Sequence, residues 1–328
     1  MTTRNFSHVK EVSWFVDDIE VGASLSIPSG EGPFPAVLFI AGSGPTDRNW
    51  NTPLLPGANG SGALLASALT DAGFVTLRYD KRASGPDRIE NTQRMAEGIG
   101  LQSHVEEVAG GMNLLAGCSY VDPARIFALT NSEGCVHAIN YQIQPTSLPF
   151  AGMILTSAFA RTAGVLARSQ IAAQLAAVPG GDAMLAAYDT AIADFLAGRS
   201  VQMDEKLPDG LQQMIQGMVQ PVNQRFVREL WVYNPVARLA EVHVPVLVVL
   251  GKKDIQVDWQ VDGALFEAFA QAHNQIRIVF MEHANHVLKF EPRSRTELVP
   301  AVVAEGYSSE DTTLDLDTVE TISSWLKG

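Results

Sequence analysis

Short apolar runs alternate with helical patterns along most of this chain, and this alternation limits the folds open to it. Residues 36–40 and 246–250 are continuous apolar runs, as expected of strands that are buried on both faces. Strands that alternate with helices predict an α/β fold, with a mostly parallel sheet and helices on both of its faces. The expected strands are residues 12–16, 21–27, 36–40, 74–79, 126–131, 151–155, 246–250 and 276–281, and helices are expected at 64–69, 105–115 and 314–326.

The alternation stops between about residues 158 and 231, where the apolar residues follow only a helical spacing. We therefore divide the chain into an α/β core, residues 1–157 and 233–328, and a helical insertion, residues 158–232. Such an insertion is expected to form a cap over the C-terminal edge of the sheet, where α/β folds bind ligands. Its methionines either line an adaptable apolar pocket or belong to the cap's own core: Met203, Met214 and Met218.

The charge, the lack of long apolar segments and the cysteine content limit the partners, the location and the cofactors that are expected. The formal net charge of −13 argues against nucleic acid or an anionic membrane as a partner. The first residues have no apolar signal-peptide segment and no run is long enough for a membrane helix, so a cytoplasmic location is expected. Cys118 and Cys135 form no C-x-x-C motif and are expected to be buried thiols, with no metal or organic cofactor. Nothing in the sequence argues for or against an oligomer.

One serine stands where an expected strand ends and a helical pattern begins. The segment Thr130-Asn131-Ser132-Glu133-Gly134 has the form G-x-S-x-G, with threonine in place of the first glycine. A strand, a sharp turn and a helix would expose the Ser132 hydroxyl at the tip of the turn. The amides at the start of the helix would point toward an approaching anion. This arrangement predicts a serine nucleophile.

A serine nucleophile needs a base and a group that orients the base. Asp254 follows the strand at 246–250, and His286 lies in the loop after the strand at 276–281, so both are expected at the same sheet edge as Ser132. Asp258 competes with Asp254, and His283 competes with His286. The remaining histidines are expected to be structural: His8, His104, His137, His243 and His273.

Acyl transfer also needs donors for the oxyanion of its tetrahedral intermediate. The backbone amide of Glu133 is one candidate. The loop after the strand at 36–40 supplies the second, for which we select the amide of Ser43, with Gly42 as the near alternative. Asp80 and Arg82 follow the neighbouring strand, where they either brace this loop or form a solvated charge pair.

Three motifs carry a family resemblance. They are Gly42-Ser43-Gly44-Pro45-Thr46-Asp47-Arg48, Gly251-Lys252-Lys253-Asp254-Ile255-Gln256-Val257 and Asn285-His286-Val287-Leu288-Lys289. With them the chain resembles the α/β-hydrolase superfamily, and within it the bacterial serine esterases and acyl hydrolases. The order Ser132, Asp254, His286 is the order of that superfamily. The resemblance implies Ser132 as nucleophile, His286 as base and Asp254 as orienting acid.

The expected function is hydrolysis of a carboxylic ester of a small molecule through an acyl-enzyme on Ser132. The same three residues would also serve a thioesterase, lactonase, amidase, peptidase or acyltransferase. A non-catalytic binding protein on the same fold is the alternative from another class.

Overall fold

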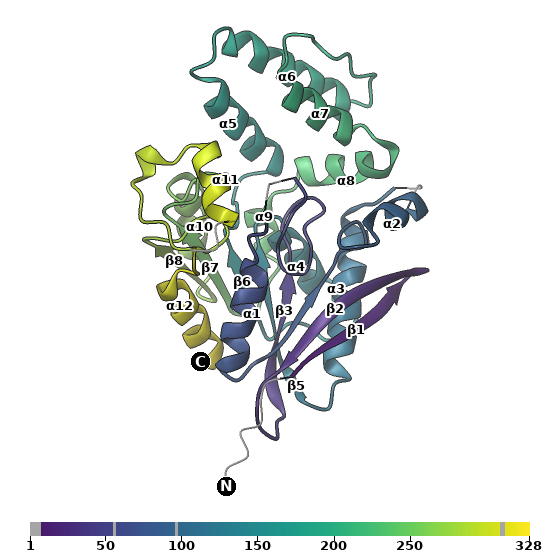
Figure 1. Cartoon of the computed structure of the whole chain (residues 1–328), viewed down its shortest axis with the longest axis vertical. Coiled ribbons are helices and arrows are strands. Elements are labelled where there is room, and N and C mark those ends of the chain that lie inside the picture. The colour runs from purple at the N-terminus through teal and green to yellow at the C-terminus, as the bar shows by residue number, and fades with distance from the viewer. Residues whose placement is uncertain (1–7, 55–56, 96–97, 309–311) are drawn as a thin grey trace. The chain divides into compact units, whose positions relative to one another are not determined.

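The computed structural model describes residues 8–54, 57–95, 98–308 and 312–328. Within this described part, eight strands form one sheet in the spatial order β1-β2-β4-β3-β5-β6-β7-β8 (Figure 1). Every expected strand is present. The strands are β1 (His8–Val16), β2 (Ile19–Ile27), β3 (Phe34–Ile40), β4 (Val75–Tyr79), β5 (Val121–Asn131), β6 (Gly152–Thr156), β7 (Val246–Gly251) and β8 (Ile276–Met281).

The sheet is parallel from β4 through β3, β5, β6 and β7 to β8, whereas β1 and β2 are antiparallel additions at one side. The prediction of a mostly parallel α/β sheet is thus confirmed. The carboxyl ends of parallel strands meet at one edge of a sheet. At that edge Asn131 pairs with Thr156, which in turn pairs with Val249, so the loops after β5, β6 and β7 leave the sheet side by side.

Helices cover both faces of the sheet. On one face α1 (Ser61–Asp71) and α12 (Leu316–Lys327) share a buried apolar cluster with Val37 and Phe39 of β3. Leu38 points to the opposite face because side chains alternate along a strand, and there it packs against Gly111 of α3 (Leu101–Ala116). The other helices of the core are α4 (Gly134–Ile143), α9 (Pro235–Leu239), α10 (Val261–Ala270) and the short elements η1 (Arg295–Glu297) and α11 (Pro300–Ser308), and α2 (Arg88–Arg94) begins in the core and ends outside it.

The helical insertion forms a compact unit of its own, which comprises Arg161–Asn234 and the segment Thr92–Ser103. Its helices are α5 (Ala163–Leu175), α6 (Gly181–Leu196), α7 (Asp209–Met218) and α8 (Pro221–Trp231). Met218 is buried in the apolar core of this unit, and Met203 and Met214 pack against that core. All three methionines therefore contribute to the unit's own packing. None of the helices in the described ranges has both the length and the apolar character needed to cross a membrane.

Candidate active site

Ser132 occupies a sharp turn between β5 and α4. Its φ is 52°, a left-handed conformation that non-glycine residues seldom adopt, and its N–H donates to the Thr156 carbonyl at 2.9 Å. Two residues later Gly134 is required, since a Cβ there would lie 2.4 Å from the Ile40 carbonyl oxygen. Thr130, by contrast, is accommodated as a buried residue of β5. The local geometry is therefore that of a strained turn that presents the Ser132 side chain.

The structure brings Asp254 and His286 together. Nδ1 of His286 lies 2.8 Å from Oδ2 of Asp254, and both side chains are buried. The other carboxylate oxygen of Asp254 accepts from the backbone amides of Gln256 at 2.7 Å and Val257 at 3.0 Å. The carboxylate can only accept, so the neutral ring of His286 carries its proton on Nδ1 and leaves Nε2 as a proton acceptor.

The loop that carries His286 is tied to the turn that carries Ser132. The His286 carbonyl accepts from the side-chain amide of Asn131 at 3.0 Å and from the Ser157 hydroxyl at 2.8 Å. Asn131 directly precedes Ser132, so one side chain fixes the histidine backbone relative to the serine turn. The side chain of Asn285 adds support within the loop by accepting from the amides of Val287 and Lys289.

The two competing residues have other contacts. Oδ1 of Asp258 accepts from the amides of Gln260 at 2.9 Å and Val261 at 3.3 Å, at the start of α10. The ring of His283 packs against Phe290, with 4.9 Å between the ring centroids. Cys135 is fully buried, and burial raises the pKa of its thiol to about 12. Cys118 is half-buried.

The loop after β3 lies against the serine turn. A Cβ on Gly42 would lie 3.3 Å from Cβ of Ser132 and 3.1 Å from the Asn131 carbonyl oxygen. The amides of Ser43 and Glu133 both belong to segments that meet at Ser132. In the part of the chain that the structure describes, neither amide donates a hydrogen bond to another group of the protein.

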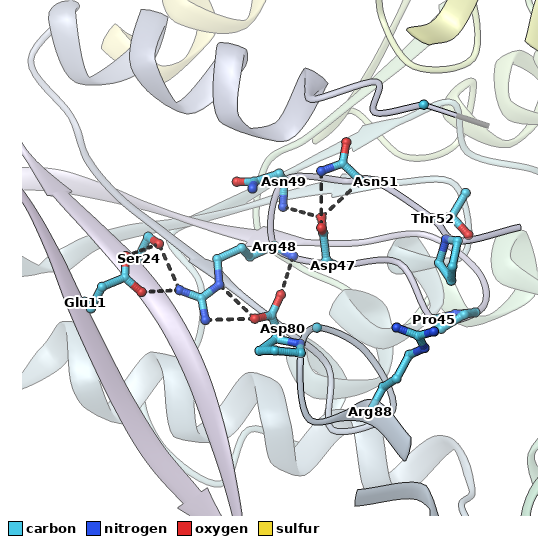
Figure 2. Close-up of a pocket in the computed structure, with 14 residues that line it drawn as sticks. Glu11, Ser24, Pro45, Asp47, Arg48, Asn49, Asn51, Thr52, Asp80 and Arg88 are labelled. Atoms are coloured by element: carbon cyan, nitrogen blue, oxygen red, sulfur yellow. Dashed lines mark hydrogen bonds and ion pairs between the residues drawn. The ribbon is translucent and has the colours of Figure 1, made fainter. Parts of the chain in front are cut away.

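Figure 2 shows how the rest of this loop is braced. Asp80 accepts from the Arg48 amide at 2.7 Å and from its Nε at 2.9 Å. Asp47 accepts from the amides of Asn49 at 2.8 Å and Asn51 at 2.9 Å. In this polar pocket of about 590 Å³ the Arg48 guanidinium pairs with Glu11 and Asp80, whereas the Asp47 carboxylate is held by amides of its own loop. The predicted brace by Asp80 is present.

Arg82 is not part of a solvated charge pair. It is buried, and its Nε lies 3.1 Å from the fully buried Glu107 carboxylate, while its Nη1 lies 2.9 Å from Asp17. Lys81 also reaches the loop, because its Nζ donates to the Gly42 carbonyl. Sequence reasoning missed Lys81. The signal that could have identified it is its position, because Lys81 follows a buried strand and lies between Asp80 and Arg82.

Glu133 and His137 form a second carboxylate–imidazole pair at the start of α4. His137 Nε2 lies 3.3 Å from Glu133 Oε1, and both side chains are buried. Burial alone would raise the pKa of the Glu133 carboxyl, but the hydrogen bond to His137 and the charge of Lys81 lower it to about 2. Burial is the main cause that lowers the pKa of His137 to about 4, so this imidazole is neutral near pH 7.

Comparison with known proteins agrees with the fold. The chain belongs to the alpha/beta hydrolase family, whose sequence profile matches residues 37–301. Esterase EstD of Thermotoga maritima is 30% identical over 112 residues, which are 34% of this chain and 24% of the esterase. The match therefore spans about a quarter of that relative's length.

Solved structures share the same architecture. A 2,6-dihydroxy-pseudo-oxynicotine hydrolase matches with a TM-score of 0.56 and 14% identity, over 97% of this chain and 67% of the other. An esterase of Pyrococcus furiosus has a TM-score of 0.56 at 15% identity, over 98% and 91% of the two chains. A proline iminopeptidase of Mycobacterium smegmatis has a TM-score of 0.55 at 15% identity, over 97% and 98%. The predicted superfamily and fold are confirmed, and the chain is a member of a hydrolase family.

Proposed function

We propose that the chain hydrolyses a carboxylic ester of a small molecule through an acyl-enzyme on Ser132. The observation that carries the proposal is the buried Asp254–His286 pair, whose histidine carbonyl is held by the residue just before Ser132. The esterase named among the relatives favours an ester over an amide as the scissile bond.

In the proposed reaction, Nε2 of His286 removes the Ser132 proton as Oγ attacks the ester carbonyl carbon. The imidazolium is stabilised by Asp254 and then gives this proton to the leaving alcohol. His286 next removes a proton from water as the water oxygen attacks the acyl-enzyme carbonyl, and it then returns this proton to Ser132 Oγ as the bond to the acyl group breaks and the carboxylic acid leaves. No metal or organic cofactor takes part in this scheme.

The amides of Ser43 and Glu133 are the proposed donors to the oxyanion that forms in both steps. Their position beside Ser132 and their lack of another acceptor among the described groups support this role. Residues 158–232 are proposed to form the cap that lines the substrate pocket, and a cytoplasmic small-molecule ester is the proposed substrate.

The experiment is intact-protein mass spectrometry after treatment with a fluorophosphonate, followed by peptide mapping. We expect one adduct, on Ser132, and we expect Ser132→Ala to lower kcat for p-nitrophenyl butyrate by about 10⁴-fold or more. Retained turnover in a folded Ser132→Ala variant would contradict the assignment. The absence of any adduct on the folded protein would favour a binding protein.

A substrate panel then decides the bond. Matched butyryl substrates with an ester, thioester, lactone or anilide bond are compared by kcat/KM, with and without an added alcohol acceptor. We expect the ester to give the highest kcat/KM. A higher value for the thioester, lactone or anilide, or preferential transfer to the alcohol, would replace the esterase proposal with the corresponding activity on the same three residues.

A further inference from the structure

Lys81 is a buried cation beside the proposed oxyanion site. It directly follows Asp80 at the end of β4, and its side chain is 3% exposed. Its Nζ donates to the carbonyl of Gly42. Gly42 is the residue whose Cα approaches Ser132 so closely that an added Cβ would lie 3.3 Å from the serine Cβ. One hydrogen bond therefore joins Lys81 to the loop that carries the Ser43 amide.

The same ammonium group also lies near Glu133. Glu133 is 4% exposed, and its carboxylate interacts electrostatically with Lys81. Burial lowers the pKa of Lys81, and the nearby Glu133 and Glu107 carboxylates oppose that shift. The backbone amide of Glu133 is the second proposed donor. Lys81 thus bonds one of the segments that supply the donors, and its charge acts on the carboxylate of the other.

The carboxylates around Lys81 are held by further buried contacts. His137 bonds Glu133, and the rings of His137 and His104 lie 4.3 Å apart between centroids. His104 Nδ1 lies 3.0 Å from Glu107, which also accepts from Arg82. A buried ion pair adds little net stability, because desolvation offsets the attraction between the charges. A gain in stability therefore gives little reason for these buried charges.

We propose that Lys81 is a positioning residue for the hydrolysis proposed above, on which this inference rests. Its ammonium group holds the Gly42–Ser43 segment against the serine turn and places a positive charge behind the point where the oxyanion forms. Lys81 itself touches no substrate. In a site of low dielectric, a fixed charge and fixed donors stabilise an oxyanion without reorganisation during the reaction.

The experiment compares four variants by kcat, KM, melting temperature and the second-order rate of fluorophosphonate labelling. Lys81→Met removes the charge and the donor with little change in length. Glu133→Gln removes the carboxylate but keeps the backbone amide, and the double variant removes both charges. Lys327→Met is the matched control, since Lys327 is exposed at the end of α12.

We expect Lys81→Met to lower kcat and the labelling rate by about 30- to 300-fold, with KM changed by less than about threefold, as expected when oxyanion stabilisation is lost. The double variant should regain the melting temperature that Lys81→Met loses, because no carboxylate is left without its cation. Its kcat should stay low. If Lys81 had only a structural role, kcat would recover together with the melting temperature, so this result separates the two roles.

Two results would overturn the inference alone. One is a Lys81→Met enzyme with kcat within about threefold of wild type, and the other is a double variant whose kcat returns to that of Glu133→Gln. In both cases the wild-type protein still hydrolyses the ester and is labelled on Ser132. A wild-type protein that does neither overturns the proposed function, and the role of Lys81 falls with it.

Discussion

Two of the carboxylate–imidazole pairs, both of which follow Ser132 in the sequence, differ in how they are built. Asp254 and His286 are 32 residues apart and come from the loops after β7 and β8. Glu133 and His137 are four residues apart at the start of one helix. The first pair is assembled by the sheet, whereas the second follows from helical spacing alone.

The pairs also differ in what surrounds the imidazole. His286 is 7% exposed and its carbonyl is fixed by the neighbour of Ser132, while His137 is 0% exposed and its ring lies in a tilted contact with His104. A neighbouring carboxylate is therefore not sufficient to identify a histidine as a catalytic base. In the proposed mechanism, exposure of the ring and a direct link to the Ser132 turn distinguish the Asp254–His286 pair from the Glu133–His137 pair.

Exchange of each imidazole for glutamine is the strongest test of this difference. His286→Gln is expected to lower kcat by about 10⁴-fold or more, because no group is left to take the Ser132 proton. His137→Gln is expected to stay within about tenfold of wild type, since a glutamine amide can still donate to Glu133. The measurement is kcat for p-nitrophenyl butyrate, with circular dichroism as the control for folding. Similar losses in both variants would remove the distinction between the pairs.

Exchange of each carboxylate is expected to have the second largest effect. Asp254→Asn should lower kcat by about 10³- to 10⁴-fold near pH 7, because the amide no longer enforces a proton on Nδ1 of His286. Glu133→Gln should cost less than about tenfold, since its backbone amide is unchanged. The pH profile of kcat/KM for both variants checks this. A larger loss for Glu133→Gln would mean that its carboxylate takes part in the chemistry.

The smallest expected effect concerns stability below neutral pH. The unfolded chain binds a proton on His137 near pH 6.5, but the folded chain binds it only near pH 4, so stability falls as the pH drops between these values. At pH 5 the loss is about 2 kcal/mol, or a few degrees in melting temperature. The shifts of the Glu133 and Glu107 carboxyls, both lowered to about 2, act at lower pH, between 4.5 and 2.

Melting temperatures at pH 7 and pH 5 for wild type, His137→Gln and His243→Gln check this prediction. The difference between the two pH values should shrink in His137→Gln. It should persist in His243→Gln, in which an exposed histidine is changed. An equal pH dependence in all three proteins would show that His137 is not the group that titrates.

The sequence was most informative where strands are buried on both faces. The run at 246–250 lies within β7, and the run at 36–40 lies within β3. At the edge of the sheet it was less informative. β1 begins at His8, whereas the sequence predicted a start at residue 12. The prediction missed residues 8–11 because they are exposed and carry no apolar pattern. Threonine in place of glycine at 130 leaves the strained turn intact, since the close approach occurs at Gly134.

The sequence did not predict the contacts between side chains of distant segments. Strand ends identify Asp254 and His286 because the sheet brings all such ends to one edge. The sheet does not dictate that Lys81 reaches Gly42 while Arg82 turns to Glu107, since adjacent residues leave a strand end in different directions. The bond from Asn131 to the His286 carbonyl depends on loop conformation in the same way.

The pairing of β6 with β7 has a consequence for the order of events during synthesis. Met153 of β6 pairs with Val246 of β7, so these two neighbouring strands are joined by a connection that comprises residues 157–245. Closing so long a connection costs little more entropy than closing a much shorter one. On the ribosome, however, the strand that precedes Ser132 emerges long before the strands that carry Asp254 and His286. A nascent chain therefore exposes an unpaired edge of β6 and has no complete site until its last quarter is made.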